Sequence, residues 1–170
     1  PVDNLFAFDP DIQHFGLPEF TLSEKLQIEL ETLGIDMSAH ILELYRETLM
    51  RLPITYAKDL LSCRSQEEVL VVGVKVSTQT PPMRSGKRVI FVTLDDATGP
   101  IDVTFFTDTQ DAYAQTIFSS SLLLARGVIR RTGPRGISLR GTGCWDLQDI
   151  AGDNSFIVSQ THYKSALSAG

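Results

Sequence analysis

The chain has 170 residues, of which 42% are hydrophobic and 21% charged, and its net charge is −6. This balance is typical of one folded domain with a small attachment and excludes a largely disordered chain. No apolar run reaches about 18 residues, which excludes a membrane-spanning helix. The two cysteines, Cys63 and Cys144, lie too far apart for a metal knuckle or a disulfide framework, so we expect a reducing, cytoplasmic setting.

Acidic residues concentrate in the first third of the chain. Residues 1–65 hold 11 acidic and 5 basic side chains, residues 66–147 hold 8 and 9, and residues 148–170 hold 2 and 1. Strong nonspecific nucleic-acid binding usually accompanies a plainly basic domain, so composition alone does not predict a nucleic-acid partner. The chain starts at Pro1 without a charged-then-apolar leader, and we expect an excised piece of a longer protein with no secretory signal.

The N-terminal part carries helix signals. Residues 1–20 contain several Pro and Gly breakers and are predicted to be an irregular tail. Thr21 and Glu24 fit a capping box ahead of leucines at helical spacing, and Ser38 fits the cap of a second helix. We predict a small helical unit over residues 21–65, which is too small for a core of its own and packs on its neighbour.

From Glu68 onward the apolar residues alternate with a period of two. The predicted strands cover residues 69–76, 88–94, 101–106, 122–131 and 137–141, the fifth with a possible extension to Trp145, and a helix over 109–118 follows the third strand. Residues 95–99, Asp-Asp-Ala-Thr-Gly, form a tight turn between the second and third strands. The segment from residue 149 to the end contains one apolar patch and is otherwise expected to be loose.

This order of elements predicts a mainly β fold: a five-stranded OB-fold Greek-key barrel with an N-terminal helical extension. The second and third strands and the flanking loops form the usual binding face of such a barrel. We place the OB-fold domain at residues 66–147 and a C-terminal tail at residues 148–170. Small barrels of other topology remain an alternative.

Four segments carry a resemblance to one protein family. They are residues 24–40 (EKLQIELETLGIDMSAH), 91–99 (FVTLDDATG), 130–136 (RRTGPRG) and 143–147 (GCWDL). Together they resemble the region of bacterial DNA polymerase III alpha subunits that joins a helical linker to an OB domain. The last two segments look most like the error-prone, translesion members of that family.

The resemblance implies the C-terminal, non-catalytic region of a template-directed nucleotidyltransferase, whose Mg²⁺-binding carboxylates lie in a palm domain absent from this chain. The implied role is binding of single-stranded template DNA during replication or translesion synthesis, without a cofactor. The family also carries a sliding-clamp-binding peptide just before this region. Leu5 and Phe6 match its apolar anchors, whereas Val2 stands where a glutamine is expected, and simple packing of Leu5 and Phe6 on the helices is the alternative.

Single-stranded nucleic acid is held by aromatic faces that stack on bases and by cations that follow phosphates. If the even-numbered residues of strand 88–94 fill the core, strand parity places Val89 and Phe91 on the outer face. Phe106 shares the outer face of the next strand, and the two rings together would form a stacking surface. The alternative for each ring is burial beneath the helical unit.

Cations gather on the first strand, the first loop and the last turn of the predicted barrel. Arginine forks suit phosphate oxygens and also stack on bases. Arg126 and Arg140 are assigned to the solvated surface, which is the alternative for the other cations as well. The predicted nucleic-acid-binding residues are Lys75, Arg84, Lys87, Arg88, Phe91, Arg130, Arg131 and Arg135.

The sequence contains no catalytic constellation. The three histidines are scattered, and none is paired with a cysteine at metal-ligand spacing. Asp95 and Asp96 are adjacent carboxylates, but their place in a turn predicts turn formation and no metal site. Two interpretations stay open: a non-catalytic OB domain that binds single-stranded DNA, and a docking module for replisome or translesion proteins such as the sliding clamp, with the acidic helical unit as its contact face.

Overall fold

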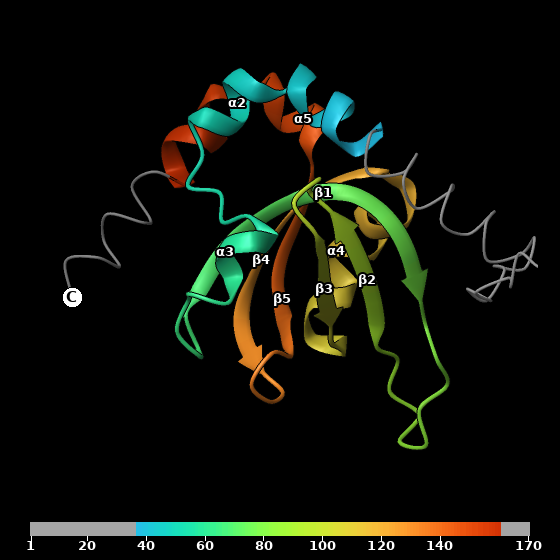
Figure 1. Cartoon of the computed structure of the whole chain (residues 1–170). Coiled ribbons are helices and arrows are strands. Elements are labelled where there is room, and N and C mark those ends of the chain that lie inside the picture. Colours follow the sequence, from blue (N-terminus) through green and yellow to red (C-terminus); the bar gives the residue numbers. More distant parts are fainter. Residues whose placement is uncertain (1–36, 161–170) are drawn as a thin grey trace, which may run out of the picture. The chain divides into compact units, whose positions relative to one another are not determined.

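The computed structural model describes residues 37–160 (Figure 1). The predicted clamp peptide with Leu5 and Phe6 and the helix expected from Thr21 lie outside the described residues, as does the end of the C-terminal tail. In addition to helical segments at residues 37–44 and 154–160, the elements are α2 (Arg46–Met50), α3 (Ala57–Leu60), β1 (Glu68–Gln79), β2 (Ile90–Asp95), β3 (Pro100–Phe105), α4 (Thr107–Ser119), β4 (Leu122–Arg131), β5 (Ile137–Asp146) and α5 (Leu147–Ala151).

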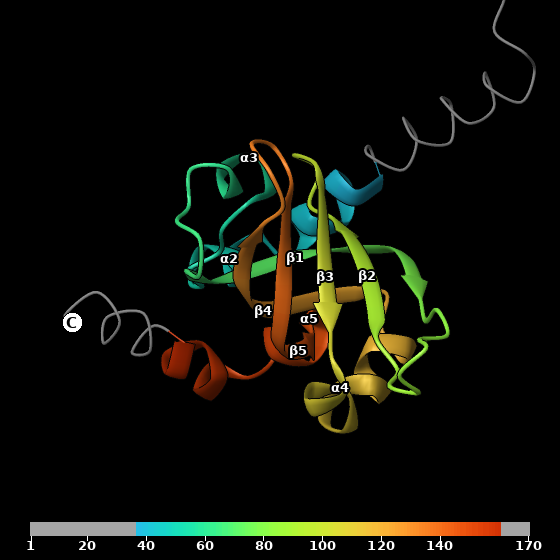
Figure 2. The same ribbon diagram turned by 90° about the horizontal axis from the view of Figure 1, so that it is seen from below.

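The five strands close into a barrel in the order β1-β2-β3-β5-β4 (Figure 2). Strands β3 and β5 pair in parallel, and all other neighbours pair antiparallel. Helix α4 follows β3, as the OB topology requires. The predicted OB barrel is confirmed, and β4 has the predicted bounds.

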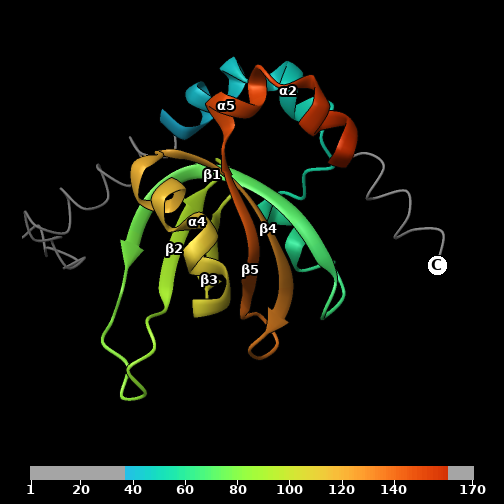
Figure 3. The ribbon, with the colours of Figure 1, turned by 180° about the vertical axis from the view of Figure 1, so that it is seen from behind.

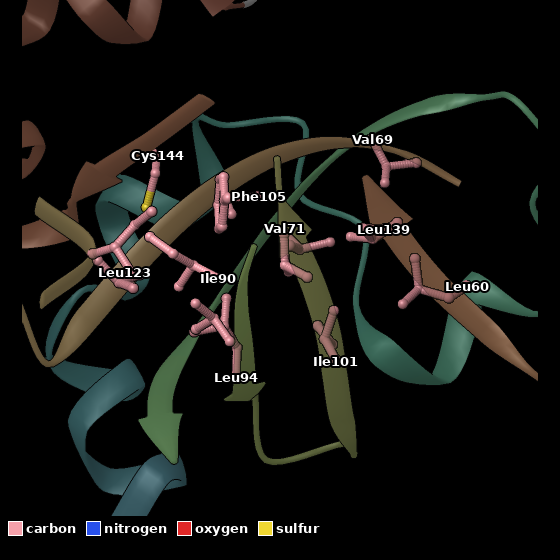
Figure 4. Close-up of a cluster of buried hydrophobic side chains, with 14 of the residues drawn as sticks. Leu60, Val69, Val71, Ile90, Leu94, Ile101, Phe105, Leu123, Leu139 and Cys144 are labelled. Atoms are coloured by element: carbon pink, nitrogen blue, oxygen red, sulfur yellow. The ribbon is translucent and has the colours of Figure 1, made fainter. Parts of the chain in front are cut away.

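Alternate residues of β2 and β3 fill the barrel interior (Figure 4). Phe105 at the end of β3 is one of the largest fully buried side chains. Its ring passes over the backbone of Gly141 in β5, where an ideal Cβ would lie 2.5 Å from Phe105 Cδ1. Only glycine leaves room for the ring at this close approach.

A second apolar cluster lies on the outer side of β1 and β4. Leu70 and Val72 of β1 pack there with leucines of α2 and of the flanking helical segments, and with Leu147 and Ile150 of α5. Figures 1 and 3 show α2 and α5 together above these strands. The described part of the predicted helical unit therefore packs on the barrel, as expected. None of the described helices is long and apolar enough to cross a membrane.

The C-terminal segment differs from the loose tail that was expected. Besides α5, residues 154–160 are helical, and Phe156 packs edge-on against Trp145 at 5.0 Å between ring centroids. Gln160 is buried and accepts a hydrogen bond from Arg126 of β4. The reason is that Leu122, Leu123, Leu124 and Ala125 of β4 are all buried, so both faces of this strand need apolar cover.

The turn between β2 and β3 connects the barrel to the helices. Asp96 is buried, and its Oδ1 accepts hydrogen bonds from Thr98 N, Thr98 Oγ1 and Gly99 N. Its Oδ2 accepts from the backbone N–H of Ala57 at 2.6 Å, at the start of α3. Ser38, expected as a helix cap, lies within a helix and donates to Asp95 at 3.3 Å. The predicted turn is confirmed, and its carboxylates are engaged in backbone contacts.

Candidate nucleic-acid interface

The outer face of the barrel carries a row of paired positions across four strands. Phe91 of β2 lies opposite Thr104 of β3, Thr104 lies beside Arg140 of β5, and Arg140 lies opposite Val128 of β4. Phe91 is 42% exposed, and it faces outward as strand parity predicts. Val89 is the exception to that parity, because it precedes the first paired residue of β2 and is buried.

An arm, defined as residues 80–89, joins β1 to β2 and projects beyond their ends (Figure 1). It carries Arg84, Lys87 and Arg88, which are all exposed, and it contains no acidic residue. Gly86 has a φ of 70°, which favours glycine, and its N–H donates to Met83 O at 3.0 Å to close the tip of the arm. The arm therefore presents three cations on a turned loop.

Helix α4 fixes the base of the arm. The side-chain amide of Gln110 is buried and donates to Arg88 O at 2.6 Å and to Phe105 O at 3.0 Å. Thr107 Oγ1 donates to the same Arg88 carbonyl at 3.2 Å. Because buried backbone acceptors need such partners, the arm is held against the start of α4.

The front cleft lies between the arm and the outer side of β4 and β5, and we define it by Lys87, Phe106, Asp108, Arg130 and Arg140. Its volume is about 610 Å³. The Arg140 guanidinium lies 5.4 Å from the centroid of the Phe106 ring and 3.0 Å from Asp108 Oδ2. The cleft thus combines three cations, one carboxylate and one aromatic ring.

The sequence assigns Arg140 to the solvated surface and leaves burial beneath the helical unit as the alternative for Phe106, yet both side chains line the front cleft. They meet because the parallel pairing of β3 with β5 brings Arg140 beside Thr104, two residues before Phe106. No local sequence pattern reports that pairing, because these strands are separated by α4 and β4.

In the part of the chain that the structure describes, five of the predicted cations make no hydrogen bond to a neighbouring backbone carbonyl through their side chains, and two others do. Arg84, Lys87 and Arg88 lie on the arm, and Arg130 lies in the front cleft. Arg135 is exposed in the β4–β5 turn, where it lines a separate hollow beside Asp102 and α3. These side chains remain available to a ligand.

Two of the predicted cations instead make structural contacts. Lys75 Nζ donates to Ile117 O at 2.6 Å and to Phe118 O at 3.1 Å, at the end of α4, and burial lowers the pKa of this ammonium group. Arg131 donates to Leu61 O and Cys63 O, both at 2.7 Å. Both side chains satisfy backbone carbonyls of neighbouring segments, and their contact with nucleic acid stays a prediction.

Acidic side chains also lie on this face. Asp102 is exposed in β3 and accepts a hydrogen bond from Thr93 Oγ1 at 2.8 Å. Together with Asp108, it adds negative charge to a face that also carries cations. Among residues 37–160, no group of three or more His, Cys, Asp or Glu side chains is placed to hold a metal ion.

Residues 69–147 match the family described as an OB-fold nucleic acid binding domain. The chain is 35% identical over 120 residues to an error-prone DNA polymerase of Symbiobacterium thermophilum, covering 69% of this chain and 11% of that protein. It is 27% identical over 121 residues to a DNA polymerase III subunit alpha of Haemophilus influenzae, covering 71% of this chain and 10% of that protein.

An error-prone DNA polymerase of Caulobacter vibrioides is 28% identical over 119 residues, covering 70% of this chain and 11% of that protein. The chain thus spans about a tenth of the length of these relatives. The barrel topology and the family match agree on the same residues. Residues 69–147 therefore form an OB-fold domain that matches this family, and the chain is similar to a segment of bacterial DNA polymerase III alpha subunits and error-prone DNA polymerases.

Proposed function

We propose that this chain is a non-catalytic region of a bacterial DNA polymerase III alpha subunit or error-prone polymerase and binds single-stranded template DNA. The strand lies across the outer face of β2, β3 and β5, with the arm at one end of this face and the β4–β5 turn at the other. The observation that carries the proposal is the front cleft, where Arg140 lies over the Phe106 ring and Lys87 and Arg130 line the same cleft.

The chemistry of this face suits an unpaired strand. Bases stack on aromatic rings whatever their identity, and cations follow the phosphates, so binding tolerates many sequences. Phe91 and Phe106 provide the rings, and the arm provides cations for the backbone. A site that holds the template must bind different base sequences, because a polymerase copies templates of any sequence. Template binding would serve replication or translesion synthesis in the bacterial cytoplasm, with the catalytic carboxylates elsewhere in the polymerase.

A second candidate function is docking of replisome or translesion proteins, including the sliding clamp. The observation in its favour is a set of exposed apolar side chains on the helical part, where Met37 is 62%, Leu44 82% and Met50 77% exposed. Such side chains are common at protein interfaces. Binding of a purified clamp to the chain, lost in a Leu5→Ala/Phe6→Ala variant, would support this candidate.

Fluorescence anisotropy of a labelled deoxythymidine oligonucleotide at two salt concentrations tests DNA binding. Each phosphate contact on a single strand contributes about −0.7 to the slope of log K against log salt. The Arg84→Ala/Lys87→Ala variant loses two contacts, so between about 50 and about 200 mM salt the wild type loses roughly sevenfold more affinity than this variant. Arg51→Ala/Lys58→Ala is the matched control, because it removes two exposed cations of the helical part.

The control variant should keep the wild-type slope. If the wild type does not bind at low salt, or if both double variants behave alike, the DNA-binding proposal is wrong.

A further inference from the structure

A second cleft lies on the opposite side of the arm. This rear cleft has a volume of about 620 Å³ and lies between the arm and α4. We define it by Pro82, Met83, Lys87, Arg88, Gln110 and Phe118. Figure 3 shows the arm and α4 from behind. The volume lies in the range of small-ligand sites, about 300–1,000 Å³.

The lining of the rear cleft combines apolar surface with positive charge. Phe118 is 55% and Met83 44% exposed, and both side chains line this one cleft, so they form a joint apolar surface open to a ligand. Lys87 and Arg88 are the charged residues of the lining, and no acidic residue lines it. An aromatic ring beside cations, without a competing carboxylate, favours a ligand with a flat ring and a negative charge, such as a nucleotide.

The Phe118 ring is presented by a fixed element. Its neighbour Ile117 is fully buried, which anchors the last turn of α4 on the barrel. The carbonyls of both residues accept hydrogen bonds from Lys75 Nζ. The C-terminal end of a helix carries partial negative charge, which would repel a phosphate. The Lys75 ammonium offsets that charge beside the cleft.

The two clefts share part of their lining. Met83 and Lys87 contribute to both the front and the rear cleft, so the clefts are separated only by the arm. The arm is held at its base by the Gln110 hydrogen bond to Arg88 O, and two successive prolines, Pro81 and Pro82, restrict its backbone. A strand that leaves the front cleft therefore reaches the rear cleft by crossing one loop, and Lys87 lies at the crossing.

We propose that the rear cleft is a second nucleobase site, in which a base of the same single strand stacks on Phe118 while Lys87 and Arg88 hold the adjoining phosphates. This inference rests on the proposed function, since it extends the path of the strand beyond the front cleft. The DNA strand then passes around the arm, with one base bound in the front cleft and another in the rear cleft. Occupation of both clefts requires a longer oligonucleotide than occupation of the front cleft alone.

The test compares deoxythymidine oligonucleotides of about 6 and about 14 nucleotides, which lie near the lower and upper ends of the site sizes of OB domains, about 4–16 nucleotides. For the wild type we expect clearly tighter binding of the longer one. Loss of one stacked base costs about 5- to 100-fold in affinity. Phe118→Ala should therefore weaken binding of the longer oligonucleotide at least about fivefold, whereas Phe118→Tyr, which keeps a stacking ring, should bind it like the wild type.

The matched control is Val158→Ala, which truncates another apolar side chain that is 55% exposed, on helical residues 154–160. Circular dichroism checks that each variant is folded. A second readout is photo-crosslinking of an oligonucleotide that contains 5-iododeoxyuridine, with the crosslink expected on the peptide that carries Met83 or Phe118.

The outcomes separate the two proposals. If the wild type binds single-stranded DNA but shows no length advantage, or if Phe118→Ala behaves like Val158→Ala, the rear cleft is not a base site and the proposed function stands. If the wild type binds neither oligonucleotide at low salt, both proposals fail together.

Discussion

Asp96 joins the β2–β3 turn of the barrel to the start of α3. Its buried carboxylate accepts four hydrogen bonds, three within the β2–β3 turn and one from Ala57 N–H at the start of α3. We predict that Asp96→Asn destabilises the protein strongly although it changes the side-chain volume very little. The amide keeps one acceptor oxygen and replaces the other with an NH₂ donor.

The magnitude follows from the geometry. If the amide oxygen faces the three donors of the turn, its NH₂ group faces the Ala57 N–H, where the carboxylate oxygen lies 2.6 Å away. The variant then loses one charge-assisted hydrogen bond, worth about 1.5–3 kcal/mol, and leaves the part-buried Ala57 N–H unsatisfied at about 1–3 kcal/mol. We expect a loss of about 3–4 kcal/mol, which lowers Tm by roughly 6–16 °C for a chain of this size.

Urea denaturation followed by Trp145 fluorescence measures the effect, since Trp145 is the only tryptophan in the chain. The control is Asp111→Asn, the same chemical change on the exposed surface of α4, which should stay within about 0.5 kcal/mol of the wild type. A free energy of unfolding for Asp96→Asn within about 1 kcal/mol of the wild type would refute the reasoning, because the four hydrogen bonds would then contribute little.

Two further predictions concern the barrel interior. Gly141→Ala places a methyl group 2.5 Å from Phe105 Cδ1 and should lower the free energy of unfolding, measured by urea denaturation, by about 1–3 kcal/mol. Adding Phe105→Leu should restore part of this loss, because the smaller side chain makes room for the methyl group. Equal losses in the single and double variants would contradict the clash. Burial raises the pKa of the Cys144 thiol to about 12, so it stays protonated and inaccessible at pH 8. A thiol reagent should then modify Cys63 alone in the native protein and both thiols in urea; rapid native labelling of two thiols would contradict this burial.

The barrel could be predicted because its signals are local. Alternation of apolar and polar residues identifies β2 and β3, and the buried residues of β2 are those that the parity predicts. The bounds of β4 agree because its apolar run starts after the helix and ends at a Gly-Pro turn. Each of these signals depends on a few neighbouring residues, so no tertiary information was needed.

The site was harder to predict because it depends on which segments meet. Parity places Lys75 on the outward side of β1, but the register of β1 against β2 shifts between Lys75 and Ser77, and the end of α4 offers carbonyls within reach. The direction of the Arg131 side chain is likewise set by the segment after α3, where two backbone carbonyls accept its hydrogen bonds. A long cation binds either a phosphate or a backbone carbonyl, and sequence does not report which acceptor lies nearby.

The net charge of −6 gives a misleading picture of the binding surface. Residues 1–36 hold eight acidic and one basic side chain, whereas the described residues 37–160 hold 13 of each sign. Within those described residues the arm cations form no ion pair. Screening limits interactions between exposed charges to about 8 Å at physiological salt, so a phosphate on the arm interacts with Arg84, Lys87 and Arg88 far more than with distant carboxylates. The acidity of the whole chain is therefore weak evidence against DNA binding, and local substitutions on the arm should dominate the salt dependence of affinity.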